Sequence, residues 1–266
     1  MVAGEGSGKQ RDGEWRSAHH LADLPSAASI GTIGGERAVA RLEPGTMRSG
    51  PMPVVFDPRV GGSLVGHLMG AMSGGAIARR SSFLLDRLGE QLFDSGITIA
   101  EDPLRLRGLR SRPFDGEGLA TSPRNLVEQG RVTGWLLESA SARQLGLEPS
   151  GHAARGGNGA PGISVGNLDL LPGTLSVDAL IADIADGVYV TELIGQGVNG
   201  VTGDYSRGAS GLRIVGGRIA GPVAGFTVAG NLLAMFAALT PASDLERDRA
   251  INVPTLRVDG MTVAGD

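Results

Sequence analysis

The alternation of apolar and polar residues predicts short strands joined by glycine-rich turns, with a few helices between them. Apolar runs at 53–56, 97–99 and 188–194 have the length and residue types of strands. Antiparallel hairpins with interleaved helices predict an α+β fold with a mostly antiparallel sheet. Three hairpins are predicted, at 125–127 with 131–136, 212–215 with 218–220, and 256–258 with 261–263.

A glycine-rich helix is predicted near residues 61–78. Apolar residues such as Leu64 and Leu68 recur there at three- and four-residue spacing, as on the buried face of a helix. Gly66 and Gly70 interrupt it, although each glycine inside a helix costs about 0.5–1 kcal/mol relative to alanine. We expect such glycines where another backbone or a substrate approaches closely. Further helices are predicted at 35–42, 81–93, 139–145 and 176–186.

His67 lies in the middle of the glycine-rich helix. A zinc-hydrolase helix needs two histidines on one face together with a glutamate, as in the motif H-E-x-x-H. His67 has neither a second histidine nor a glutamate within one turn. Two interpretations therefore stay open: a histidine hydrogen-bonded to a backbone carbonyl, or a side chain that faces a substrate cleft.

Composition and charge exclude several classes of function. The 266-residue chain has a formal net charge of −4, and its basic residues form no stripe that would neutralise nucleic-acid phosphates. It contains no cysteine, so it can form neither a disulfide framework nor a thiolate metal site. No secretory signal and no membrane-length apolar run are visible. We therefore expect a cytoplasmic protein without a nucleic-acid or membrane partner.

Residues 189–214 form a second glycine-rich motif, in which Asp204, Tyr205 and Arg207 supply an acid, a phenol and a guanidinium. The motif is not a P-loop, because no lysine follows its glycines. A glycine-rich strand with bulges is the structural alternative to a functional loop.

Two segments lack periodicity. Residues 1–20 are glycine-rich and charged, and we expect them to be partly disordered or an edge segment. Residues 148–166 contain His152, and a loop of this length is either functional or disordered.

The run PVVFDPRVGGSLVGHLMGAMSGGAIARRSSFLLDRLGEQLF, around His67, resembles the TldD/PmbA family and in particular its PmbA (TldE) branch. The segments GDYSRGASG and TVAGNLLAMF are similar to the same branch. The family includes zinc metallopeptidases once described as modulators of DNA gyrase. In the TldD branch the corresponding helix carries H-E-x-x-x-H, whose three functional residues fall here on Gly66, His67 and Ala71. The resemblance therefore implies that this chain does not hold the zinc.

The resemblance also implies a domain plan and a function. It implies a C-terminal domain at 51–266, preceded at 1–50 by the remnant of an N-terminal half. The chain would be the non-zinc-binding subunit, inactive alone, of a TldD/TldE-type heterodimer that cleaves small or unfolded peptides. Zinc is expected in the TldD-like partner, with no cofactor and no catalytic residue here. The candidates for lining the substrate cleft are His67, Asp204, Tyr205 and Arg207.

An alternative function is a non-proteolytic peptide- or protein-binding module, such as a structural or regulatory homodimer. An autonomous peptidase with a metal bound elsewhere is disfavoured, because the chain has only four histidines and no spacing that fits a site.

Overall fold

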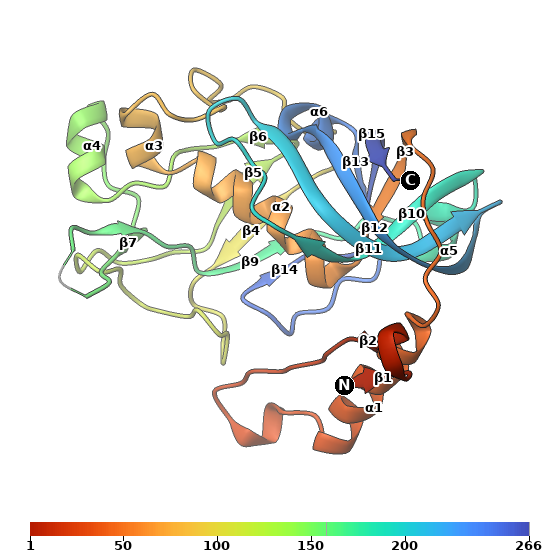
Figure 1. Ribbon diagram of the computed structural model, residues 1–266. Helices are drawn as coiled ribbons and strands as arrows, with labels where there is room; N and C mark the ends of the chain where they lie inside the picture. The colour runs from red at the N-terminus through yellow and green to blue at the C-terminus, as the bar shows by residue number, and fades with distance from the viewer. Residues whose placement is uncertain (158, 266) are drawn as a thin grey trace.

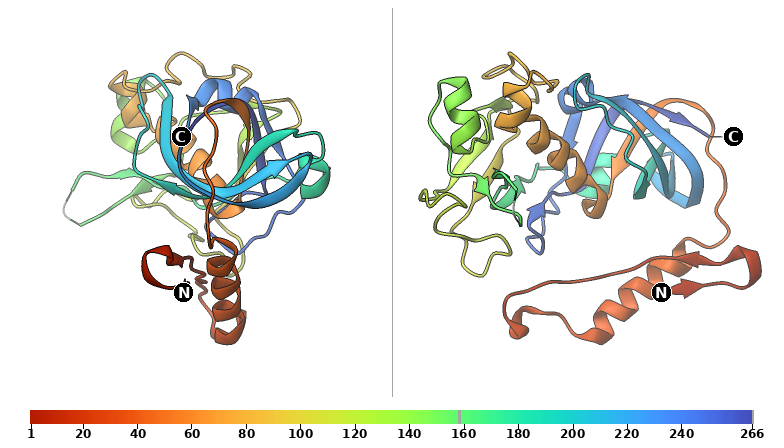
Figure 2. Two further views of the ribbon diagram at one scale, coloured as in Figure 1. Left: turned by 45° about the vertical axis from the view of Figure 1, so that its right-hand side comes forward. Right: turned by 60° about the vertical axis from the view of Figure 1, so that its left-hand side comes forward.

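The protein has the α+β fold predicted from the sequence, as seen in a computed structural model that describes residues 1–157 and 159–265. A small N-terminal unit of residues 1–40 lies below the body in every view, and residues 41–49 connect the two (Figures 1 and 2). None of the helices in these described ranges is long and apolar enough to cross a membrane.

The N-terminal unit is a long helix packed beside a two-stranded ribbon. The helix begins after Ser26, whose Oγ accepts a hydrogen bond from the Ser29 N–H at 3.1 Å. This cap makes the helix longer than the predicted 35–42. Residues 1–20 contain both strands of the ribbon, which pair with each other in a separate two-stranded sheet and not at the edge of a larger sheet. The elements of the unit are β1 (Val2–Ala3), η1 (Gly6–Gly8), β2 (Gln10–Arg11), η2 (Leu21–Asp23) and α1 (Ala27–Ala40).

The larger sheet of the body curls until its ends meet. Its strand order is β12-β11-β10-β3-β15-β13, and β12 also pairs with β15. Five strands therefore close into a small barrel, seen as a ring in the left view of Figure 2. β3 and β10 are parallel, and the other paired neighbours are antiparallel. The strands are β3 (Gly50–Phe56), β10 (Asp186–Ile194), β11 (Asp204–Val215), β12 (Arg218–Asn231), β13 (Leu239–Pro241) and β15 (Leu256–Ala264).

The smaller sheet has five strands in the order β14-β9-β4-β5-β6. Its β5–β6 hairpin confirms the turn predicted at Gln129 and Gly130, both of which have positive φ. A further two-stranded ribbon, β7 with β8, occupies part of segment 148–166, whose residue 158 lies outside the described residues. The strands are β4 (Ile99–Asp102), β5 (Arg124–Glu128), β6 (Arg131–Val132), β7 (Ala153–Ala154), β8 (Gly162–Ile163), β9 (Asn167–Leu170) and β14 (Ile251–Asn252).

Helix α2 (Pro58–Ala71) runs through the centre of the body and contacts β3 and β10 of the barrel and β14 of the smaller sheet (Figure 1). Asp57 caps it by accepting from the Arg59 N–H at 2.8 Å, and Pro58 fits the first turn, where no N–H is needed. Its apolar face, including Leu64 and Leu68, is buried in the main core as predicted.

The single helix predicted near 61–78 is in fact two helices, α2 and α3 (Gly74–Ala78). Leu136 causes the break, because its carbonyl accepts from the Gly74 N–H at 2.8 Å while its own N–H donates to Met72 O. These bonds replace the intrahelical ladder at this point. The remaining helices are α4 (Ser139–Leu145), α5 (Val177–Ile181) and α6 (Leu232–Ala237).

Two further predictions are wrong. Residues 81–93 form turns instead of a helix: Ser82 Oγ accepts from the Leu84 N–H, Asp86 has positive φ, and Leu88 on the predicted buried face is 47% exposed. Residues 256–263 form no hairpin, because both halves belong to β15 and pair with the same strand, β3. The predicted turn at Gly260, whose φ is +77°, is a bulge within that strand.

Candidate substrate groove

A groove of about 270 Å³ lies beside the exposed face of α2. One wall is this helix, and the other is the loop between β10 and β11, with part of the segment that follows α3. The loop folds back along the start of β11, where Val198 bridges Tyr205. The lining residues are Gly66, His67, Gly70, Ala71, Ser81, Phe83, Gln196, Val198 and Gly200.

The glycines on the helix wall are not there for close packing inside the protein. A Cβ atom added at Gly66 or at Gly70 would meet no atom within 4 Å. Gly74 is the opposite case, since its Cβ would collide with Leu137 and Ser141. The helix backbone is therefore bare on the groove side, which lets another chain approach it closely.

Of the four candidate residues, His67 lines this groove, and Tyr205 and Arg207 lie close to His67 without lining the groove themselves. Tyr205 and Arg207 are two apart on β11, so their side chains leave the same face of the strand. The ring of Tyr205 contacts that of His67 edge-on, with centroids 6.1 Å apart and planes at 75°. Four buried side-chain atoms have no well-aligned hydrogen-bond partner in the described residues. Three of them belong to this cluster: His67 Nε2, Tyr205 OH and Arg207 Nε. The backbone-carbonyl interpretation of His67 therefore does not describe its Nε2.

The electrostatics of this cluster follow from burial and from one positive charge. Burial lowers the pKa of His67, and the Arg207 guanidinium lowers it further. Burial raises the pKa of Tyr205 to about 12, although Arg207 opposes the rise. At neutral pH the cluster thus holds a neutral imidazole, a neutral phenol and a cation.

Asp204 does not join the other three. Its side chain is exposed on the opposite face of β11 and accepts hydrogen bonds from Thr202 Oγ1 at 2.6 Å and Asn231 Nδ2 at 3.2 Å. These two hydrogen bonds lower the pKa of Asp204. Asn231 also caps α6 by accepting from the Leu233 N–H. In this arrangement Asp204 fastens the loop that forms the groove's outer wall.

The residues at the groove do not fit a zinc ion. Of the three positions Gly66, His67 and Ala71, only one has a side chain that can coordinate a metal. Across residues 1–157 and 159–265, no group of three or more His, Cys, Asp or Glu is placed to hold one.

His152 lies elsewhere, in a buried polar chain that sequence patterns did not reveal. It is 2% exposed; its Nε2 is 2.8 Å from Glu101 Oε2 and its Nδ1 is 2.7 Å from Ser150 Oγ. Glu101 also accepts a hydrogen bond from the Gly166 N–H at 2.5 Å. Burial by itself would raise the pKa of Glu101, but the hydrogen bond to His152 and its other contacts lower the pKa below the usual value. Ser150 Oγ also accepts a hydrogen bond from the Leu137 N–H at 2.7 Å. These hydrogen bonds attach segment 148–166 to the body of the protein.

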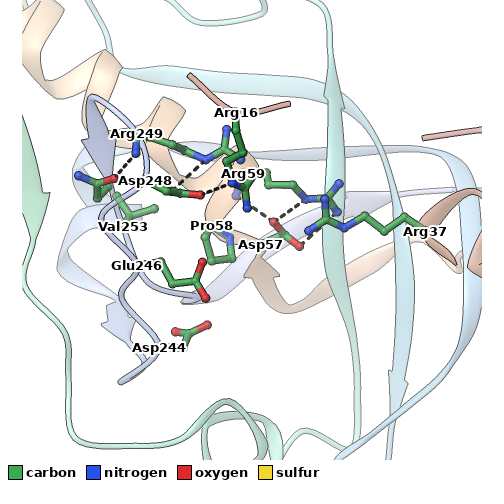
Figure 3. A pocket seen from close by; sticks show the side chains of 11 residues that line it. Arg16, Arg37, Asp57, Pro58, Arg59, Asp244, Glu246, Asp248, Arg249 and Val253 are labelled. Carbon is green, nitrogen blue, oxygen red and sulfur yellow. Dashed lines mark hydrogen bonds and ion pairs between the residues drawn. The ribbon is translucent and has the colours of Figure 1, made fainter. Parts of the chain in front are cut away.

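A second, charged pocket of about 200 Å³ lies between the N-terminal unit and the body (Figure 3). Glu14, which does not line the pocket itself, forms ion pairs with three arginines that do: Arg16, Arg37 and Arg249. The Glu14 side chain is 1% exposed. Arg59 joins the two parts as well, donating to Asp12 at 3.0 Å. Asp12 and Glu14 belong to the stretch RDGEW. The sequence did not predict their ion pairs with Arg59 and Arg249, because these arginines are distant in sequence.

Sequence reasoning also missed the second wall of the groove, formed by Gln196, Val198 and Gly200. The glycine content of that loop was the available signal, but spacing alone does not tell which helix a loop faces.

Residues 49–265 match the model of the PmbA/TldA metallopeptidase C-terminal domain. The chain is 38% identical over 266 residues to the metalloprotease PmbA of Escherichia coli O157:H7, covering 100% of this chain and 57% of that protein. It therefore spans little more than half the length of this relative.

Two solved structures have the same fold. A Thermotoga maritima protein described as a candidate modulator of a DNA gyrase is 28% identical with a TM-score of 0.89, covering 99% of this chain and 60% of that one. TldE from Thermococcus kodakarensis has a TM-score of 0.87 at 22% identity, covering 99% and 61%.

Proposed function

Because this chain belongs to the PmbA/TldD metallopeptidase family, we propose that it is the non-zinc-binding subunit of a TldD/TldE-type peptidase. In this proposal a TldD-like partner holds the zinc, and this chain supplies one wall of the cleft that receives a small or unfolded peptide. The complex would work in the cytoplasm, without binding nucleic acid.

The observation that carries the proposal is the groove beside α2. Its helix wall is bare backbone at Gly66 and Gly70, and His67 lies between these glycines on the same wall. A groove with glycine walls suits an extended peptide, whose own backbone must come near the protein surface to hydrogen-bond. The same positions lack the side chains to activate water on a metal, which supports a binding role over a catalytic one.

The test is reconstitution with a TldD-like zinc subunit. We expect the two proteins to co-elute in size-exclusion chromatography, and the mixture to cleave an unfolded peptide faster than either protein alone. Gly66→Phe, which fills the groove, should abolish the gain. Gly31→Phe is the matched control, since Gly31 is a helical glycine of α1 with equally open space.

A mixture that elutes as two separate proteins and cleaves no faster than the zinc subunit alone would contradict the proposal. The chain would then be the non-proteolytic binding module that the sequence left as the alternative.

A further inference from the structure

Arg207 is a half-buried cation without an anionic partner. In the described residues its Nη2 donates to Leu193 O at 3.5 Å, its Nε is buried without a partner, and no carboxylate forms an ion pair with it. Two other partly buried arginines differ, because Arg59 contacts Asp12 at 3.0 Å and Arg105 contacts Asp169 at 2.7 Å. Arg112 also has a buried Nε without a partner, but its Nη2 donates to Ser164 O. Because burying an unpaired charge is costly, a site of this kind is completed when an anion binds.

The two neighbours of Arg207 do not supply that anion. Tyr205, 1% exposed, carries a neutral phenol whose OH makes no well-aligned hydrogen bond in the part of the chain that the structure describes. Arg207 lies near enough to lower the pKa of this phenol against the effect of burial. His67 is held neutral, so its ring offers one donor and one acceptor nitrogen. The cluster thus combines one positive charge with two neutral side chains that can hydrogen-bond. His67 lines the groove, and Tyr205 and Arg207 lie next to it.

We infer that the His67–Tyr205–Arg207 cluster binds a carboxylate of the peptide that occupies the groove. This inference rests on the proposed function. A carboxylate is planar, accepts hydrogen bonds in the fork geometry of a guanidinium, and brings one negative charge to the single cation. A phosphate, with nearly two charges, would leave one of them unmatched here. The carboxylate comes either from the peptide's C-terminus or from an acidic side chain.

Three acetylated tripeptides separate these sources when their binding to the intact chain is measured by calorimetry. The first is Ala-Ala-Ala with a free C-terminus, the second is its C-terminal amide, and the third is the amide of Ala-Asp-Ala. We expect a carboxylate-bearing peptide to bind about tenfold or more tighter than the uncharged amide. Preference for the first identifies the C-terminus, and preference for the third identifies an acidic side chain.

Variants of the cluster test which group is responsible. Arg207→Gln should abolish the preference, Arg207→Lys should keep part of it because the charge remains, and Tyr205→Phe should weaken it several-fold. Arg218→Gln, an exposed arginine at the far end of the β11–β12 hairpin, is the control and should change nothing. Thermal unfolding of each variant establishes that it is folded.

Equal binding of all three peptides, or a preference that survives in Arg207→Gln, would overturn the carboxylate site and leave the peptide groove standing. Failure of every peptide to bind the intact chain would overturn the carboxylate site and the peptide-binding role together.

Discussion

His67 of α2 lies edge-on against Tyr205 of β11, with ring centroids 6.1 Å apart. The pair connects the central helix to the barrel at the groove. Edge-on contact directs the positive edge of one ring at the negative face of the other, an arrangement that contributes about 0.5–1.5 kcal/mol beyond area burial. The contact leaves two buried polar atoms, His67 Nε2 and Tyr205 OH, without well-aligned hydrogen bonds in the described residues.

His67 should titrate below its ordinary pKa of 6.5, because burial and Arg207 both disfavour the imidazolium. Its folded pKa lies below the unfolded one, so its contribution to stability is lost as the pH falls through 6.5 and below. In Arg207→Gln the pKa should rise toward 6.5, whereas Arg218→Gln should leave it unchanged. NMR titration of the His67 ring protons measures this, and an unchanged pKa in Arg207→Gln would disprove the coupling.

Gly66→Ala and Gly74→Ala should have opposite effects on stability. The methyl group added in Gly66→Ala would lie in open space, so the variant gains helix propensity and is stabilised by about 0.5–1 kcal/mol. The methyl group added in Gly74→Ala would collide with Leu137 and Ser141, which costs about 1–3 kcal/mol. Urea unfolding of both variants measures the difference. If both variants lose stability equally, the open face assigned to α2 is wrong.

Glu101 should make stability fall in acid. Its folded pKa is depressed below 4.5, so its contribution is present above that value and is lost as the pH falls through the folded pKa. Glu101→Gln should lose about 1–3 kcal/mol at neutral pH and show a flatter dependence below pH 4.5.

Glu128→Gln on β5, an exposed glutamate, is the control for Glu101 and should behave like the parent chain. Unfolding free energies at pH 7 and pH 4 give the comparison. The same acid dependence in Glu101→Gln as in the parent would refute the assignment.

Glu14→Gln should loosen the N-terminal unit and weaken its link to the body, because Arg16 and Arg37 belong to the unit and Arg249, 3.8 Å from Glu14, belongs to the body. Glu14 is nearly fully buried among three arginines, and removing one partner of a buried ion pair costs about 3–5 kcal/mol. Amide hydrogen exchange should then speed up in residues 1–40 and stay unchanged in the barrel. Glu5→Gln, an exposed glutamate of the same unit, should have no such effect. Identical exchange in the parent and Glu14→Gln would show that other contacts hold the unit.

Local chemistry could be predicted wherever it acts over a few residues. Ser176 accepts from the Ala179 N–H as an N-cap, Gly146 ends α4 with a φ of 68°, and the β11–β12 hairpin turns at Gly216 and Gly217. In each case the residue itself prefers the observed backbone or cap conformation. The same reasoning failed at 81–93, where backbone bonds to distant partners such as Gly130 and Gly200 replaced the helix.

The sequence by itself determined the fold class, the family and the position of the glycine-rich helix, because residue types and short spacings carry that information. Only the tertiary structure decided which candidates meet. It brought His67 to Tyr205 and Arg207, because the barrel closes against α2, and it turned Asp204 away, because neighbouring residues on a strand point to opposite faces. Spacing along the chain could not reveal that the groove and the ion pairs around Glu14 join segments far apart in sequence.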